Sequence, residues 1–120
     1  MSMEDFMAVL KNEFEAGEGS FLIKLRPGLE WDRAAFNRLT FAMKCCAEST
    51  SNDPKLERWV VEGFWNVSWF VRSWATHPNF PKVHSSEYYD KAFTRLDDLA
   101  YWCFMGQSPY ESGKHFEDLI

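Results

Sequence analysis

The sequence predicts an all-α fold, a four-helix bundle-like single domain spanning residues 1–120. Apolar side chains recur three and four residues apart in four long stretches, which is the period of a helix with one buried face. Residues that favour helix starts and stops bound most of these stretches. With 120 residues, 46% of them hydrophobic, the chain is long enough to bury its own core without disulfides or metals.

The first helix is predicted over about residues 3–16, with Ser2 as its cap and Gly17 and Gly19 as its stop. Its apolar stripe consists of Met3, Phe6, Met7, Leu10 and Phe14. Phe21–Leu25 is a short apolar run closed by an Arg-Pro-Gly turn, and we expect a short extended segment there. It is either a connector laid across the bundle or a strand that pairs with a second chain.

The second helix is predicted from the cap candidate Asp32 to about Glu48. The third is predicted to start at Asp53-Pro54, where Asp caps and Pro needs no N–H, and to end near Ala75. A helical projection of the third helix places on one inner arc Trp59, Val60, Phe64, Val67, Phe70, Val71 and Trp74.

The fourth helix is predicted to be capped by Ser85 or Ser86, to run to Met105 and to stop at Gly106. Its inner stripe comprises Tyr88, Tyr89, Ala92, Phe93, Leu96, Leu99, Ala100 and Cys103. Residues 106–120 are predicted to be a loosely held C-terminal tail.

Two sets of aromatic side chains fall outside these inner stripes. Trp65 and Trp69 form an i,i+4 pair on the other side of the third helix, where flanking segments cover them or a partner does. The outer face of the fourth helix combines acids with aromatic rings: Asp90, Asp97, Asp98, Tyr101 and Trp102. Because tyrosine and tryptophan dominate binding hot spots, we expect both sets to contact a protein partner.

The composition narrows the kinds of partner. Eighteen acidic against thirteen basic residues give a net charge of −5, which disfavours nucleic acid and suits a basic protein partner. The sequence has no apolar run long enough for a membrane span and no signal-peptide pattern, so a cytoplasmic protein without membrane contact is expected. Cys45, Cys46 and Cys103 are expected to be reduced thiols.

No catalytic, metal or cofactor site is predicted from the motifs. The sequence contains neither Cys-x-x-Cys nor His-Glu-x-x-His, and its three histidines do not follow a metal-ligand spacing. The adjacent Asp97 and Asp98 point about 100° apart on a helix, so they do not converge on one reacting atom.

One short segment resembles a catalytic motif. Arg72-Ser73-Trp74-Ala75-Thr76-His77 is similar to the Arg-x4-6-His motif of HEPN-type ribonucleases, which are small α-helical domains that act as dimers. The resemblance implies that Arg72 would bind phosphate and that His77 would act in RNA cleavage. An RNA-cleaving domain must also hold a polyanion, to which the acidic charge of this chain is poorly suited.

In size, acidity and acid-plus-aromatic surface, the chain resembles bacterial immunity proteins, which neutralise a toxin by occluding it. The resemblance implies an inhibitor that binds a partner protein, and this is the function we expect first. The HEPN-like ribonuclease is the first alternative. A structural homodimer paired through Phe21–Leu25 is the second.

Overall fold

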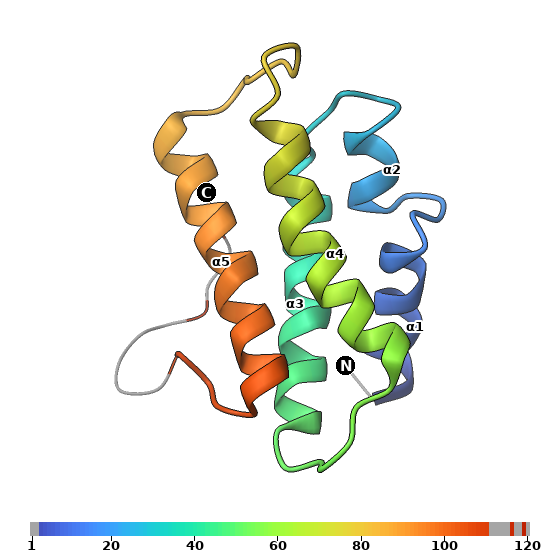
Figure 1. The fold of residues 1–120 in the computed structure, drawn as a ribbon. Helices are drawn as coiled ribbons and strands as arrows, with labels where there is room; N and C mark the ends of the chain where they lie inside the picture. The colour runs from blue at the N-terminus through green and yellow to red at the C-terminus, as the bar shows by residue number, and fades with distance from the viewer. Residues whose placement is uncertain (1–2, 111–115, 117–118, 120) are drawn as a thin grey trace.

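A computed structural model describes residues 3–110, 116 and 119 (Figure 1). Within these residues the regular structure is entirely helical, which confirms the predicted all-α class. The helices are α1 (Met3–Phe14), α2 (Phe21–Leu25), α3 (Arg33–Thr50), α4 (Arg58–Ala75) and α5 (Ser86–Met105). In the described part of the chain, no helix is both long and apolar enough to cross a membrane.

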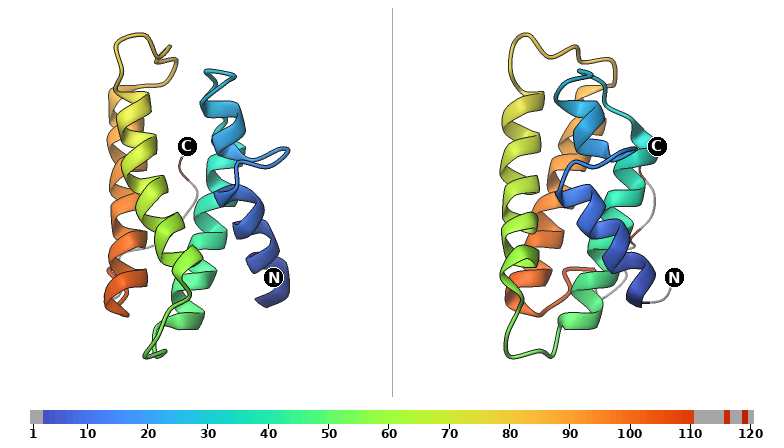
Figure 2. Two further views of the ribbon diagram at one scale, coloured as in Figure 1. Left: turned by 45° about the vertical axis from the view of Figure 1, so that its right-hand side comes forward. Right: turned by 90° about the vertical axis from the view of Figure 1, so that its right-hand side faces the viewer.

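The long helices alternate in direction, so that the chain runs up α1, down α3, up α4 and down α5 (Figure 1). The short α2 continues the column that α1 begins, which gives the bundle four columns. Figure 2 shows two layers, with α4 and α5 in one and α1, α2 and α3 in the other. The core lies between these layers, and α4 presents its opposite side to the outside of the molecule.

Three predicted helix boundaries are confirmed by their capping contacts. The Asp32 side chain accepts a hydrogen bond from the Ala35 N–H at 3.0 Å, and the Ser85 hydroxyl accepts one from the Tyr88 N–H at 3.1 Å. Gly106 ends α5 in the left-handed conformation, with φ of 70°. Asp32 and Ser85 satisfy N–H groups that have no partner inside the helix, and the Gly106 N–H donates to the Trp102 carbonyl in the last turn of α5.

The end of α1 differs from the prediction, because Ala16 rather than Gly17 takes the left-handed position, with φ of 54°. The Gly17 N–H donates to the Asn12 carbonyl and the Ala16 N–H to the Glu13 carbonyl. This pair of bonds is a Schellman motif with Ala16 at its left-handed residue. The predicted cap Ser2 lies outside the described residues.

The expectation of an extended segment near residues 21–25 is wrong, because Phe21–Leu25 is a turn of α-helix. The Ser20 hydroxyl accepts a hydrogen bond from the Ile23 N–H at 3.2 Å, which caps the helix locally. Phe21 and Leu25 are fully buried. The segment therefore presents no strand edge for pairing with a second chain.

The predicted start of α4 at Asp53-Pro54 is also wrong. The Asp53 N–H closes a turn onto the Thr50 carbonyl after α3, and α4 begins only at Arg58. The intervening Leu56 packs against the core, so the chain stays out of the helix until it has passed that contact. Glu57 stands at the N-cap without a side-chain capping bond.

The predicted inner stripes of α4 and α5, together with residues of α3, form most of the core. Phe36, Leu39 and Met43 from α3 are fully buried, as are Phe64 and Val71 from α4. Trp31, which precedes α3, is also buried and donates its indole N–H to the Tyr88 hydroxyl at 2.9 Å. The bundle thus has an aromatic cluster at the end where α5 begins.

Gly63 leaves room on α4 for the ring of Phe14 from α1. A Cβ atom at this position would overlap the ring of Phe14. Phe14 packs edge-on against two rings of α4, with centroids 6.3 Å from Trp59 and 5.7 Å from Phe64. The space that a side chain at position 63 would occupy is therefore filled by an aromatic ring from another helix.

Candidate functional site

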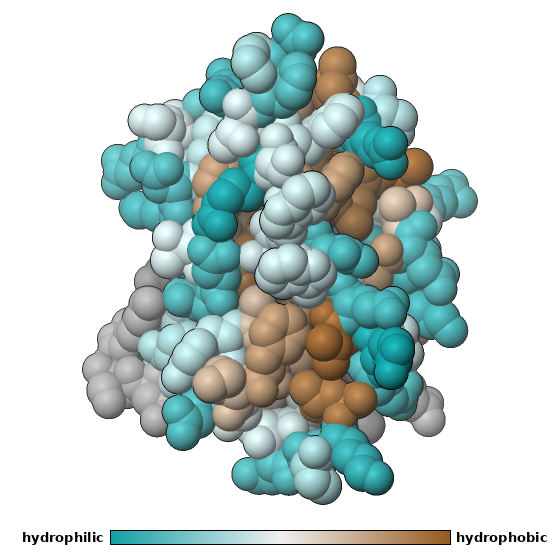
Figure 3. All heavy atoms as spheres, in the orientation of Figure 1, coloured by the Kyte–Doolittle hydropathy of each residue, from teal (hydrophilic) through white to brown (hydrophobic). Residues whose placement is uncertain are grey.

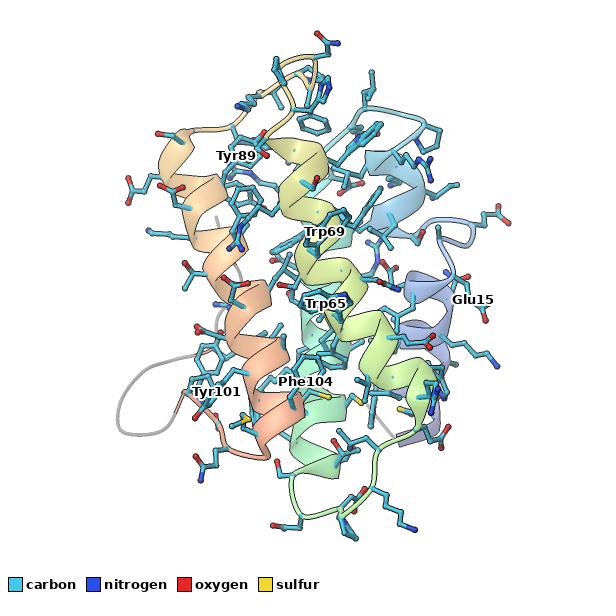
Figure 4. All side chains as sticks on the ribbon, in the orientation of Figure 1. Glu15, Trp65, Trp69, Tyr89, Tyr101 and Phe104 are labelled. Atoms are coloured by element: carbon cyan, nitrogen blue, oxygen red, sulfur yellow. The ribbon has the colours of Figure 1, made fainter. Side chains whose placement is uncertain are left out.

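Trp65 and Trp69 lie on the outer side of α4, one helical turn apart (Figure 4). Their side chains are 60% and 61% exposed, although large aromatic residues are usually covered. The opposite side of the same helix packs into the core through Val60, Phe64, Val67 and Val71. The question left open by the sequence is thus answered, since both indoles face outward.

The exposed aromatic surface continues onto α5. Phe104 is exposed, and Figure 4 places it below Trp65 on the same side of the molecule. Figure 4 labels both indoles, and at the same places Figure 3, in the same orientation, shows a pale column that runs into a brown, hydrophobic area over the lower ends of α4 and α5. We call Trp65, Trp69 and Phe104 the aromatic face.

Asp97 ties α4 to α5 beside this face. Its carboxylate accepts hydrogen bonds from Arg72 Nη2 at 2.6 Å and from the Ser68 hydroxyl at 2.9 Å. The guanidinium of Arg72 also lies 5.4 Å from the ring centroid of Phe93. Because Arg72 and Asp97 are about half exposed, this pair contributes little stability, although it links the two helices at the surface.

Trp102 is the clearest correction to the predicted binding face. The sequence placed it on the outer side of α5, but it is only 7% exposed. Its indole N–H donates to the Ser51 hydroxyl at 3.1 Å, and its ring lies 6.1 Å from that of Tyr110. The end of α3 and the chain beyond α5 cover this side of the helix. Trp102 therefore cannot reach a partner as the structure stands.

Arg95 is a buried cation on α5. It is 7% exposed, and its guanidinium lies 4.0 Å from the ring centroid of Phe116 and 5.6 Å from that of Tyr110. Burial raises the pKa of the Tyr110 hydroxyl to about 12. The signal that could have revealed this site is the pair of aromatic residues beyond α5, which a helical projection does not place.

The acids predicted for the binding face line two neighbouring hollows, and Asp98 belongs to both of them. Asp97, Asp98 and Tyr101 line one groove of about 810 Å³, which Gln107, Ser108 and Pro109 complete. Asp90 is exposed nearer the start of α5 and lines a different hollow with Lys91, Thr94 and Leu119. The structure thus brings three of the predicted residues together next to the end of α5.

Arg72 and His77, the two residues of the ribonuclease-like motif, contact different parts of the molecule. Arg72 is engaged with α5 through Asp97, as described above. The His77 ring stacks on Trp74 with centroids 6.5 Å apart, and its Nδ1 accepts a hydrogen bond from the Asn79 N–H at 3.1 Å. In the described contacts, the two side chains do not meet at a common site.

The three cysteines differ in burial, and two of them lie inside the protein. Cys45 is half-buried, whereas Cys46 and Cys103 are buried, and all three are free. Burial raises the pKa of Cys46 to about 12 and that of Cys103 to about 11. Across residues 3–110, 116 and 119, no group of three histidine, cysteine or acidic residues is placed to hold a metal ion.

Comparison with known proteins adds no family to this description. No protein-family model matches the chain, and neither a curated protein nor a solved structure shows significant similarity to it.

Proposed function

We propose that this protein is a protein-interaction module that binds its partner through the aromatic face of α4 and α5. The observation that carries the proposal is the exposure of Trp65 and Trp69 on a helix whose other side is in the core. Tryptophan is enriched in binding hot spots, because it offers a large rigid surface with few rotatable bonds. A helix packed on one side presents such rings in a fixed geometry.

The surroundings of the face favour a basic partner. The chain carries a net charge of −5, and Asp97 and Asp98 lie with Tyr101 in the groove beside the end of α5. Acidic side chains at the rim of an interface accelerate the encounter with a basic partner and help to set its orientation. In this arrangement the aromatic rings supply affinity and the acids supply the association rate.

The specific form of this function that we propose is an immunity-type inhibitor, which silences a partner by covering it. A small rigid helical domain with an acidic groove beside an aromatic face suits this task. Asp90, about two turns from the groove, would contact a partner only if the interface extended along α5. Trp102 is not included in the proposed face, because it is covered.

Site-specific photocrosslinking in cells that express the protein naturally tests the proposal. A benzophenone amino acid at position 65 or 69 is expected to form an adduct with one other protein on irradiation. The same label at Phe41, an exposed ring on α3, is the matched control and is expected not to capture it. An adduct formed equally from position 41, or none from positions 65 and 69, would contradict the proposed face.

The captured partner then allows the inhibitory function to be measured. Replacing Trp65 or Trp69 by serine is expected to weaken binding by about 2 kcal/mol or more each, which is roughly a thirtyfold rise in Kd. The partner's activity should be suppressed by the natural chain and restored with the double variant. Binding without any change in the partner's activity would leave an interaction module but exclude the inhibitor.

A further inference from the structure

We propose that a groove between α2 and α4 binds a small organic carboxylate with a flat apolar body. The groove has a volume of about 580 Å³ and is lined by Ala16, Leu22, Ile23, Arg26, Pro27, Phe70 and Trp74. We call it the Arg26 groove. It is separate from the aromatic face, because Phe70 and Trp74 project toward α2, whereas Trp65 and Trp69 project outward.

The wall contributed by α4 is a pair of parallel rings. Phe70 and Trp74 stack with centroids 6.0 Å apart and planes inclined by only 12°. The indole N–H of Trp74 donates to the Leu25 carbonyl at 3.2 Å, which fixes the ring against α2. Figures 1 and 2 both show α2 beside the upper half of α4, where this bond joins them. The groove therefore has a rigid, flat aromatic side.

The opposite wall is aliphatic and belongs to α2 and the turn after it. Leu22 packs against the core, while Ile23 and Pro27 are exposed at the edge of the groove. Flat rings on one side and branched aliphatic groups on the other suit a planar apolar molecule. The volume also falls within the range of about 300–1,000 Å³ that is typical of small-molecule sites.

Arg26 supplies the charge that selects the ligand. Arg26 is exposed and lines the groove, so its charge stands at the solvent-facing mouth, and its guanidinium carbon lies 5.9 Å from the ring centroids of both Phe70 and Trp74. Within the described residues, no carboxylate pairs with Arg26, whereas the nearby Lys24 is bonded to Asp32 at 2.6 Å. The donors of the Arg26 guanidinium thus remain available.

A carboxylate is the group that best matches this cation. The planar guanidinium can donate two parallel hydrogen bonds to a carboxylate, which an amide or alcohol cannot accept in the same way. Among the described residues that line the groove, only Arg26 carries a charge. An apolar anion would therefore bury its body between the two walls and hold its charge at the mouth.

The test is an NMR titration that follows the indole N–H signals, using the chain with Trp65 and Trp69 replaced by serine so that exposed indoles do not bind the probe. The probes are 1-naphthaleneacetate, the neutral 1-naphthaleneacetamide and the cationic 2-(1-naphthyl)ethylamine. We expect the carboxylate to shift the signal of Trp74 and the backbone amides of Leu22 and Ile23. It should bind about tenfold more tightly than the amide, and the amine should bind most weakly.

Three variants assign the preference to Arg26. Arg26→Met is expected to raise the Kd of the carboxylate about tenfold and to leave that of the amide unchanged, because the apolar stem remains. Arg26→Lys should retain part of the preference. Arg58→Met, which removes an exposed arginine at the start of α4, is the matched control and should behave as the parent does.

The following results would overturn the proposal. Equal affinity for the carboxylate and the amide would show that Arg26 does not select an anion. Shifts that avoid Trp74 would place the probe elsewhere. Broadening of the groove signals with protein concentration alone would assign the groove to a second copy of the chain. Tighter binding of a peptide ending in phenylalanine than of 1-naphthaleneacetate would assign it to a chain terminus instead of a free small molecule.

Discussion

The carboxylate of Glu13 accepts a hydrogen bond from the backbone N–H of Phe21 at 2.9 Å, inside the protein. Glu13 is 3% exposed, so a side chain of α1 satisfies an N–H group at the start of α2. Burial raises the pKa of Glu13 above its ordinary value of 4.5, although the bond from Phe21 and the charges of Arg38 and Lys24 act in the opposite direction. The cost of burying the charge therefore outweighs these attractions.

This relationship predicts how Glu13 contributes to stability as a function of pH. With a folded-state pKa above the unfolded value of 4.5, the folded chain binds more protons between the two values. The contribution of Glu13 to the free energy of unfolding therefore falls as the pH rises through this window. Glu13→Gln cannot titrate and should lack this pH dependence. The free energy of unfolding of the variant, compared with that of the parent, should therefore be higher at neutral pH than below the ordinary pKa of Glu13. Urea unfolding at a series of pH values measures the difference.

Glu13→Ala is the control for the hydrogen bond itself. It removes the acceptor of the Phe21 N–H without replacing it, and should cost about 1–3 kcal/mol at neutral pH. If the Gln variant showed the same pH profile as the parent, the titration of Glu13 would not contribute to stability.

Truncation of the tryptophans should separate the core from the proposed face. Trp102→Ala is expected to destabilise the fold by about 3–5 kcal/mol, because it empties a large buried site and leaves Ser51 without its donor. Trp65→Ala should change stability by no more than about 0.5 kcal/mol, since that indole is exposed. Chemical denaturation of the two variants gives the comparison, and equal losses would contradict the assigned positions.

The contact between Gly63 and Phe14 predicts an unusual response to alanine. In an exposed helix interior, Gly→Ala stabilises by about 1 kcal/mol. Here Gly63→Ala should instead destabilise by about 1–3 kcal/mol, because the new methyl group displaces the Phe14 ring from its packing against α4.

The double variant Gly63→Ala with Phe14→Leu tests that mechanism. The smaller, flexible leucine should leave room for the methyl group, so the cost of the alanine should be smaller in this background. Additive losses in thermal or urea unfolding would show that Phe14 is not the group displaced.

The thiols should differ in their reactivity toward a disulfide reagent at about pH 8. Cys46 and Cys103 are buried and their pKa values are raised to about 12 and about 11, so neither forms a reactive thiolate in the folded protein. Half-buried Cys45 should react first, and all three should react in concentrated guanidinium chloride. In Cys45→Ser, rapid labelling of the native protein should disappear. Its persistence would place another thiol at the surface.

The features that could be predicted from the sequence are those determined by neighbouring residues. The caps at Asp32 and Ser85 and the stop at Gly106 depend on side chains within a few positions, and each lies where the pattern indicated. Phe21–Leu25 was mistaken for an extended piece because a five-residue apolar run has no readable period. Its helix depends instead on Ser20 and on Glu13 from another helix.

The candidate site was predicted less well, for a related reason. Trp65 and Trp69 were placed correctly off the core arc, but only the packed structure shows that both indoles stay exposed among the described residues. Trp102 was placed on the surface because a helical projection counts one buried stripe, whereas α5 is covered on a second side, where Arg95 is also buried. The covering residues Tyr110 and Phe116 come from a region without helical periodicity.

Tyr110 and Phe116, which cover Arg95 and Trp102, also limit where the chain can be shortened or labelled. A chain ending before Tyr110 would expose an indole and an arginine that are now buried, next to the acidic groove. Trp102 and the cationic Arg95 would then form a second aromatic surface, and this one would be positively charged. The shortened protein would therefore not bind partners as the natural chain does. Affinity tags, fluorescent labels and immobilisation chemistry should therefore leave Tyr110 and Phe116 in place.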